Sequence, residues 1–253
     1  MTDLSALARR SVWHPAWIDF SETSGFCMST NNLWMESEQL TDDVFSAHRQ
    51  VETIHLDARR TAVIVIDMVN DFCKPGGAMV LPGYETLIEP QRALVEAARA
   101  SGAPVIWVHD EHRRNVRQDR EWLKRSPHCV EGTWGRDIID DLGARDDEIH
   151  VIKRRYSAFF GTDLDLTLKD SKVDQLVIFG VVTNICVRST VHDGFFQGYE
   201  IVVPRDACAA TGPREQESSL YDIATHFGVV SDAATVARSL REGVKIVNLD
   251  LAA

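Results

Sequence analysis

The sequence lacks any apolar run long enough to cross a membrane. Its 253 residues are 44% hydrophobic and 26% charged, values typical of a globular protein that exclude a disordered or collagen-like chain. Its apolar stretches fall far short of the roughly 18 residues of a transmembrane helix. The first twenty residues are interrupted by the charges of Asp3, Arg9, Arg10 and Asp19 and lack the apolar core of a secretory signal. We therefore expect a cytoplasmic protein with no membrane partner.

Basic charge and paired cysteines are also scarce. The 27 Lys and Arg residues are outnumbered by 38 Asp and Glu residues, which gives a formal net charge of -11. Such a chain repels nucleic-acid phosphates, so we expect no nucleic-acid partner. The cysteines are odd in number and form no CxxC pair, which predicts reduced thiols rather than a disulfide framework. They are Cys27, Cys73, Cys129, Cys186 and Cys208.

Short apolar runs alternate with amphipathic helical patterns from residue 61 onward. The predicted strands are residues 62–67, 104–109, 150–153, 175–182, 200–204 and 228–231. The predicted helices are residues 89–100, 184–197, 215–227 and 232–242. This alternation predicts one doubly wound α/β domain, residues 61–253, with a mainly parallel six-stranded sheet and helices on both faces. Such sheets bind ligands at the carboxyl ends of their strands, near the point where the strand order reverses.

Residues 1–60 do not continue the alternation. They contain Trp13, Trp17 and Trp34 but few periodic apolar runs. Because three tryptophans are unusual in a segment that buries nothing, we predict an irregular N-terminal extension packed against the domain or a neighbouring subunit. The alternative is a partly mobile tail.

Three chemically active residues fall at predicted strand ends. Asp67 ends the first strand, Lys153 ends the third, and Cys186 opens the helix after the fourth. Each has an ordinary structural interpretation: a turn or cap for the aspartate, a solvated basic run for the lysine, and a small core residue for the cysteine. In a parallel sheet, however, all three would lie along one edge.

Together, these three residue types fit nucleophilic catalysis by a thiol. A cysteine attacks as the thiolate, whose formation is favoured at a helix N-terminus and beside a cation such as Lys153. Asp67 can take the thiol proton and deliver it to a leaving amine. Backbone N–H groups in the strand-to-helix turn at residues 180–186 are placed to bind the oxyanion of a tetrahedral intermediate.

Three segments resemble the isochorismatase-like cysteine hydrolases. They are IDMVNDF (residues 66–72), KRRYSAFFGTDL (residues 153–164) and GVVTNICVRSTVHDGFFQGY (residues 180–199). The resemblance extends from about residue 61 to the C-terminus. It implies that Asp67, Lys153 and Cys186 form the catalytic triad of that family.

The resemblance also implies features of the backbone and the assembly. It places a cis peptide bond between Val181 and Val182, and it builds the oxyanion hole from the N–H groups of Val182 and Cys186. It further implies a strand order of 3-2-1-4-5-6, numbered along the chain, and a homo-oligomer.

Cys186 also indicates which reaction the resemblance implies. Family members that hydrolyse the vinyl ether of isochorismate lack the nucleophilic cysteine, so its presence favours hydrolysis of a C–N bond through an acyl thioester. Residues 154–160, 183–196 and 226–232 resemble most closely the ureidoacrylate amidohydrolases of pyrimidine degradation and their relatives that act on biuret-like and N-carbamoyl compounds. This implies an amidohydrolase of nitrogen metabolism that acts on a small ureido, carbamoyl or linear amide compound, such as ureidoacrylate, biuret or triuret.

The metal-containing nicotinamidases are an alternative branch. They bind a divalent metal through an Asp-x-His pair and a later His in an HCVxGT segment. Here Asp110 and His112 form such a pair, and residues 128–133 read HCVEGT, which makes His128 the third candidate ligand. If His112 instead contacts substrate or solvent and His128 is structural, no cofactor is needed, and this is our first expectation. A third hypothesis is a non-catalytic interaction protein on a hydrolase scaffold.

Aromatic residues near the strand ends are candidates to wall a small planar ligand, with a polar residue near its polar end. The aromatic candidates are Phe72, Trp107, Tyr156 and Phe160, and the polar candidates are Asp110 and His112. The basic segment at residues 113–125 predicts either an anion-binding lid or a solvated helix face.

Overall fold

The apolar runs form a parallel β-sheet in the computed structural model, which describes residues 48, 50, 52–116 and 118–249. Six strands lie side by side, in the order β4 (Ile149–Lys153), β3 (Val105–Asp110), β2 (Thr61–Ile66), β5 (Gln175–Val181), β6 (Glu200–Pro204) and β8 (Val229–Ser231). All five pairings between them are parallel. Counted along the chain, this order is 3-2-1-4-5-6, which confirms the prediction. A short strand, β7 (Cys208–Ala209), pairs with the end of β5.

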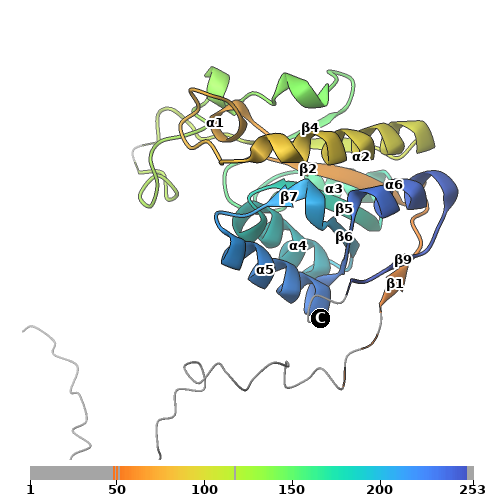
Figure 1. Ribbon diagram of the computed structural model, residues 1–253. Coiled ribbons are helices and arrows are strands. Elements are labelled where there is room, and N and C mark those ends of the chain that lie inside the picture. Colours follow the sequence, from red (N-terminus) through yellow and green to blue (C-terminus); the bar gives the residue numbers. More distant parts are fainter. Residues whose placement is uncertain (1–47, 49, 51, 117, 250–253) are drawn as a thin grey trace, which may run out of the picture. The chain divides into compact units, whose positions relative to one another are not determined.

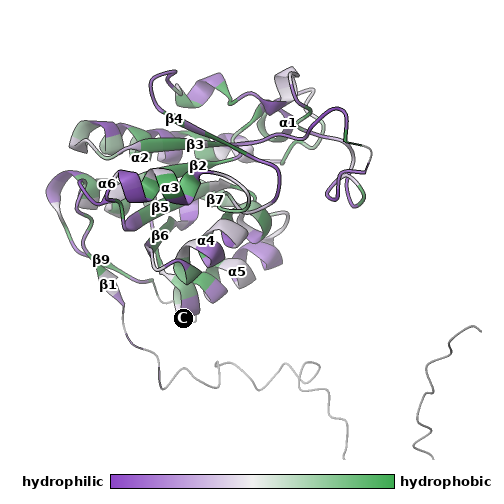
Figure 2. Cartoon of the chain, turned by 180° about the vertical axis from the view of Figure 1, so that it is seen from behind, coloured by the Kyte–Doolittle hydropathy of each residue, from purple (hydrophilic) through white to green (hydrophobic). Residues whose placement is uncertain are grey.

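Strands β2, β3 and β5 form the centre of the sheet. Every residue of these three strands is buried, as expected for parallel strands covered on both faces. Figure 2 shows apolar residues concentrated in these strands. The strand order reverses between β2 and β5, so their carboxyl ends mark the edge at which a ligand is expected.

Helices cover both faces of the sheet (Figure 1). One face carries α2 (Ile88–Ser101) and α6 (Ala233–Glu242), which pack against each other. The other face carries α4 (Arg188–Phe196) and α5 (Pro213–Asp222). These four helices confirm the prediction of helices on both faces.

Local sequence signals explain where two of these helices begin and end. Gly102 follows α2 in the left-handed conformation, which glycine adopts readily at a helix C-terminus. Asp232 precedes α6, and its carboxylate accepts a hydrogen bond of 2.7 Å from the Thr235 N–H group.

The remaining helical elements are short. They are α1 (Asn70–Cys73), η2 (Tyr84–Leu87), η3 (Trp134–Arg136), η4 (Asp140–Leu142), α3 (Leu164–Asp170), η5 (Thr183–Val187), η6 (Arg205–Ala207) and η7 (Ile223–Phe227). The predicted helix at residues 184–197 is divided into the π-helical turn η5 and α4, and the one at residues 215–227 is divided into α5 and η7. The sequence did not predict α3.

Two further strands lie outside the main sheet. β1 (Thr53–Ile54) pairs antiparallel with β9 (Ile246–Val247). Residues 53–54, which we assigned to the N-terminal extension, therefore pair with a strand near the end of the domain. The three tryptophans of that assignment lie in residues 1–47, outside the described residues, so the packing of the extension stays a prediction.

The described residues bear on two predictions, which concern the cysteines and membrane-spanning helices. Cys73, Cys129, Cys186 and Cys208 are free thiols, as their scattered spacing predicted, whereas Cys27 lies outside the described residues. Within the described part of the chain, no helix has both the length and the apolar character needed to cross a bilayer.

Gly180 allows β5 to approach β2 beside the ligand-binding edge. Its φ is +128°, and a Cβ atom there would lie 2.1 Å from the Ile66 carbonyl oxygen.

We expect Gly180→Ala to lower the free energy of unfolding by about 3 kcal/mol or more, because rotating a side chain cannot relieve an overlap with backbone. Gly198 is the matched control, since its φ is +91° but a Cβ atom would meet nothing within 4 Å. Gly198→Ala should cost about 1 kcal/mol. Urea unfolding measures both losses, and equal values would contradict the prediction.

Candidate active site

Three strand ends bring Asp67, Lys153 and Cys186 together, as the sequence predicted. Asp67 directly follows β2, Lys153 is the last residue of β4, and Cys186 lies in η5 after β5. The Lys153 Nζ atom is 2.9 Å from Asp67 Oδ2 and 3.7 Å from Cys186 Sγ. All three residues are buried, so Lys153 does not belong to a solvated basic run.

Asp110 joins these residues from β3. It pairs in register with Lys153, and its Oδ1 atom accepts a hydrogen bond of 3.1 Å from the Lys153 Nζ atom. Burial alone would lower the pKa of Lys153, but Asp110 and Asp67 outweigh burial and hold this pKa well above its usual range. Lys153 is therefore a fixed positive charge at neutral pH.

The same burial opposes formation of the Cys186 thiolate. Burial raises the pKa of the Cys186 thiol well above its usual range; Lys153 opposes this rise, whereas Asp67 and Asp110 add to it. Lys153 thus acts in the expected direction, but burial, together with Asp67 and Asp110, outweighs it, so the net change in the pKa of Cys186 in the free protein is upward. Cys186 thus keeps its proton at neutral pH, and its activation requires a base nearby.

Asp67 is the carboxylate suited to be that base. Burial raises the pKa of Asp67 to about 6, although Lys153 favours its charged form. The carboxylate is therefore ionised at neutral pH but more basic than a surface aspartate, which suits proton transfer. Its φ of +53° is uncommon for a residue other than glycine, and such backbone conformations are frequent at functional sites.

The turn after β5 presents its backbone at the same place. The peptide bond between Val181 and Val182 is cis, as the resemblance implied. The turn η5 follows directly, and Val182 and Cys186 both line one cavity. The oxyanion hole formed by the N–H groups of Val182 and Cys186 stays a prediction.

A cavity of about 310 Å³ opens beside Cys186. Phe72, Tyr156 and Asp110 line it, as predicted. The wall also contains Met79, Val80, Leu81, Ile185, Glu121, Arg125, His128 and Thr211. A mainly apolar wall with a few polar groups is typical of a site for a small molecule.

Three other substrate-binding candidates do not line this cavity. Trp107 is fully buried in β3 and donates a hydrogen bond of 2.7 Å from Nε1 to Glu148 Oε2, because a strand covered on both faces directs its large side chains into the core. Phe160 is 65% exposed and borders a separate hollow. His112 is fully buried, beside Asp110. These three residues therefore lie outside the wall of this cavity, and their contact with a ligand stays a prediction.

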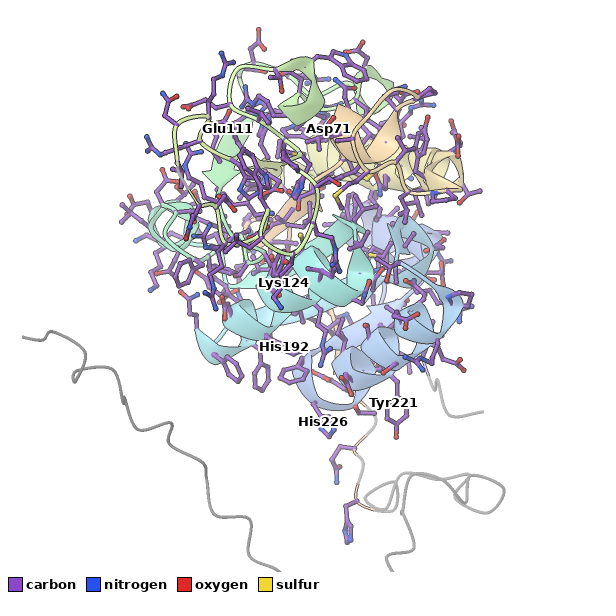
Figure 3. All side chains as sticks on the ribbon, turned by 90° about the vertical axis from the view of Figure 1, so that its left-hand side faces the viewer. Asp71, Glu111, Lys124, His192, Tyr221 and His226 are labelled. Atoms are coloured by element: carbon purple, nitrogen blue, oxygen red, sulfur yellow. The ribbon has the colours of Figure 1, made fainter. Side chains whose placement is uncertain are left out.

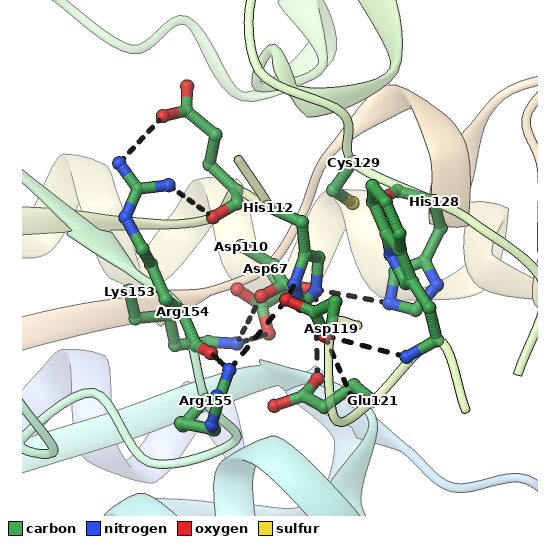
Figure 4. Close-up of polar contacts among 12 residues, drawn as sticks. Asp67, Asp110, His112, Asp119, Glu121, His128, Cys129, Lys153, Arg154 and Arg155 are labelled. Carbon is green, nitrogen blue, oxygen red and sulfur yellow. Dashed lines mark hydrogen bonds and ion pairs between the residues drawn. The ribbon is translucent and has the colours of Figure 1, made fainter. Parts of the chain in front are cut away.

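Asp110 is also one of four polar side chains that lie close together (Figure 4). Asp110, His112, Glu121 and His128 offer atoms that all lie within 4.8 Å of one another. The Asp110 Oδ2 atom is 3.3 Å from His112 Nε2 and 3.5 Å from His128 Nε2, and His112 Nε2 is 3.7 Å from Glu121 Oε2. Ligand atoms that share one tetrahedral metal at about 2.1 Å lie about 3.4 Å apart, so these spacings fit a divalent cation.

Hydrogen bonds on the far side of each imidazole orient these histidines. His112 Nδ1 is 2.9 Å from Asp119 Oδ2, and His128 Nδ1 is 2.7 Å from the Ser126 carbonyl oxygen. If each Nδ1 carries the proton and donates it, each Nε2 is left as an electron-pair donor, the arrangement found in metal-binding histidines. Within the described residues, His112 Nε2 and Glu121 Oε1 are buried without a hydrogen-bond partner. These unpaired atoms also fit metal coordination.

Asp71, which is labelled in Figure 3, supports the loop that carries His128. It belongs to α1, and its Oδ2 atom accepts a hydrogen bond of 2.6 Å from the Cys129 N–H group. Its Oδ1 atom accepts another, of 3.0 Å, from the Ala78 N–H group. One carboxylate thus ties the loop after α1 to the residue that follows His128.

The sequence prediction missed Glu121. This residue lies in the basic segment at residues 113–125, in which Asp119 and Glu121 are the only acidic residues. The described part of the segment forms turns rather than the solvated helix we considered, and both acids are buried next to His112. Burial and the nearby Asp110 raise the pKa of Glu121 to about 7. The sequence signal that could have identified Glu121 is the presence of two acidic residues in a segment otherwise rich in Arg and Lys.

Comparison with known proteins agrees with this geometry. Residues 61–235 match the family model of the isochorismatase domain. The chain belongs to the isochorismatase family. Within this family, a cysteine hydrolase from Pseudomonas syringae pv. phaseolicola 1448A is similar, at 30% identity over 77% of this chain and 98% of that chain, with a TM-score of 0.71.

Two amidases are also similar to this isochorismatase-family chain. The N-carbamoylsarcosine amidase of Thermoplasma acidophilum is 31% identical over 69% of this chain and 96% of that chain, with a TM-score of 0.62. The pyrazinamidase of Pyrococcus horikoshii, solved in complex with zinc, is 29% identical over 68% of this chain and 99% of that chain, with a TM-score of 0.64.

Removing the ammonium group tests this charge arrangement. We expect Lys153→Met to lower the free energy of unfolding by about 3–5 kcal/mol at neutral pH, because it leaves Asp67 and Asp110 buried without their cation. The folded-state pKa of Asp67, already about 6, rises further without the ammonium group. Asp67 in the folded variant then stays protonated to above pH 6. Its contribution to stability is fully present below the unfolded-state pKa of about 4 and is lost as the pH rises through the higher folded-state pKa. The loss should therefore be larger at pH 8 than at pH 5.

Lys74→Met is the matched control for this prediction. Lys74 forms an ion pair with Asp141 in which both side chains are partly exposed. Its removal should cost less than about 1 kcal/mol. Urea unfolding of both variants at pH 5 and pH 8 makes the comparison, and a loss in Lys153→Met that does not change with pH would contradict it.

Proposed function

We propose that this protein is a cysteine amidohydrolase with Cys186 as its nucleophile. The observation that carries the proposal is that Cys186 lies in the cavity wall, with its Sγ atom 3.7 Å from an ammonium group that also contacts Asp67. Nucleophile, base and cation are thus assembled at one end of a cavity sized for a small molecule. This arrangement favours an enzyme over a non-catalytic interaction protein.

The geometry supports a two-stage reaction. As the Cys186 sulfur attacks the amide carbon, Asp67 accepts the thiol proton, and the N–H groups of Val182 and Cys186 stabilise the oxyanion. Asp67 then gives its proton to the departing nitrogen, the C–N bond breaks, and an acyl thioester remains. Asp67 next takes a proton from water, whose oxygen attacks the thioester carbon, and the thiol regains a proton when the acid leaves. Lys153 stays protonated throughout and holds Asp67 in place.

The proposed substrate is a small ureido, carbamoyl or linear amide compound. Arg125 and Thr211 add polar groups to the apolar cavity wall, as a polar ligand requires. The similarity to an N-carbamoylsarcosine amidase supports the carbamoyl class. A homo-oligomer and a role in pyrimidine degradation stay predictions from the resemblance, and a cytoplasmic location stays a prediction from the sequence.

We also propose that Asp110, His112, Glu121 and His128 hold a divalent metal ion. Carboxylate and imidazole ligands suit zinc, iron or manganese, and two of their buried atoms have no other partner among the described residues. A bound ion supplies Lewis-acid chemistry next to the cavity. The similarity to a pyrazinamidase solved with zinc makes a metal-containing, nicotinamidase-like amidase the second candidate function.

Ammonia release across a panel of amides tests the nucleophile. The panel contains ureidoacrylate, biuret, triuret, N-carbamoyl amino acids, maleamate and nicotinamide. We expect Cys186→Ala to lower kcat/KM for the best substrate by at least about a thousandfold, because no other group on the cavity wall can form the thioester.

Cys73→Ala is the matched control. Cys73 is also buried, and burial raises the pKa of its thiol to about 12, but it does not line the cavity. This variant should keep nearly wild-type kcat/KM. Activity that survives in Cys186→Ala would overturn the nucleophile assignment.

Elemental analysis of the purified protein tests the metal proposal. After exposure to zinc, iron or manganese and desalting, the wild type should retain about one ion per chain. His128→Asn and Glu121→Gln should retain much less, whereas His226→Asn, an exposed histidine, should match the wild type. Retention by all variants alike would overturn this site. Metal retention together with nicotinamide as the best substrate would favour the second candidate function.

A further inference from the structure

Asn184 and Thr211 form a two-point bracket at the cavity. Asn184 lies in η5, two residues before Cys186, and Thr211 lies between β7 and α5. The Thr211 N–H group donates a hydrogen bond of 3.2 Å to Asn184 Oδ1, and Asn184 Nδ2 donates one of 3.1 Å to Thr211 Oγ1. The bracket therefore joins the turn that carries the nucleophile to a second segment of the cavity wall.

The chemistry of this bracket fixes the direction of each hydrogen bond. A backbone N–H group can only donate, so the amide oxygen of Asn184 must face it. The Asn184 NH2 group must then face the Thr211 hydroxyl, and because an NH2 group can only donate, Oγ1 must accept. The opposite amide orientation would place two donors against each other.

The Thr211 hydroxyl proton is consequently left over. Among the described residues, no acceptor for Thr211 Oγ1–H is within hydrogen-bond distance, and Thr211 lines the cavity beside Cys186. Solvent takes this proton in the free protein. Thr211 is exposed, so a ligand that enters the cavity beside it can replace this solvent with an acceptor of its own.

We propose that Thr211 is a specificity-determining residue, whose hydroxyl donates a hydrogen bond to the substrate and is held in the donor state by Asn184. The inference rests on the proposed amidohydrolase function. In the proposed reaction the N–H groups of Val182 and Cys186 bind the scissile carbonyl oxygen. Thr211 therefore donates to a second acceptor on the substrate. The substrate class is therefore an amide that carries a further carbonyl or carboxylate oxygen.

The first experiment removes the hydroxyl while keeping the shape of the side chain. With the best substrate of the amide panel, Thr211→Val should lower kcat/KM by roughly tenfold to a hundredfold, mainly through KM, because a site built to donate loses its donor. Thr211→Ser keeps the hydroxyl and should restore most of the loss. The rate of Cys186 alkylation by iodoacetamide should stay close to that of the wild type in both variants, because the hydroxyl does not act on the thiol.

The second experiment reverses the direction in which the Thr211 hydroxyl donates its proton. Asn184→Asp is nearly isosteric, but its carboxylate accepts from both the Thr211 N–H group and the Thr211 hydroxyl, so the proton turns away from the substrate. We expect a loss of kcat/KM similar to that of Thr211→Val. The double variant should lose little more than either single variant, since both remove the same donor.

Each outcome is decisive. Additive losses in the double variant would mean that Asn184→Asp acts through its charge and not through Thr211, which overturns the role of Asn184. An active wild type with Thr211→Val within twofold of it would overturn the role of Thr211 and leave the amidohydrolase function standing. A wild type that releases ammonia from no panel amide would overturn the proposed function and this inference with it.

Discussion

One buried ammonium group holds the site together. The Lys153 side chain has no exposure to solvent, and its charge is stable there only because Asp67 and Asp110 lie 2.9 and 3.1 Å away. These three residues come from the carboxyl ends of β4, β2 and β3, so the cluster forms only when these strands pair in the observed order and register. The catalytic arrangement and the core of the sheet are therefore parts of one cooperative structure.

Asp110 connects this ammonium group to the acidic and histidine cluster. Its Oδ1 atom accepts a hydrogen bond from Lys153, while its Oδ2 atom faces His112 and His128. Burial alone would raise the pKa of Asp110, but Lys153 and the two histidines outweigh burial and hold it well below its usual range. A cation on the Oδ2 side would compete with Lys153 for the same carboxylate. More of the ammonium field would then act on Asp67 and Cys186, so an ion bound there would favour the charged form of both groups.

The sequence predicted the strand ends well and the cavity wall less well, for a physical reason. Unbroken apolar runs fix where buried strands end, and Asp67, Lys153 and Cys186 follow from those ends. Trp107 belongs to such a run, but the pattern does not distinguish a side chain that fills the core from one that faces a ligand. Glu121 lies in a segment without periodicity, so the pattern does not show that its side chain is buried beside His112.

This difference between strand ends and loops bears on which groups around the cavity can change independently of the charge cluster. Strand pairing positions Asp67 and Lys153, and Cys186 lies in the turn that follows β5, whereas Arg125 and Thr211 reach the cavity from loops. A loop can change its polar groups without disturbing the charge cluster, provided that something ties it to the nucleophile. The bracket of Asn184 and Thr211 provides such a connection, since its hydrogen bonds join η5 to the loop before α5. Specificity can thus vary in the loop while the distance between Lys153 and Cys186 stays constant.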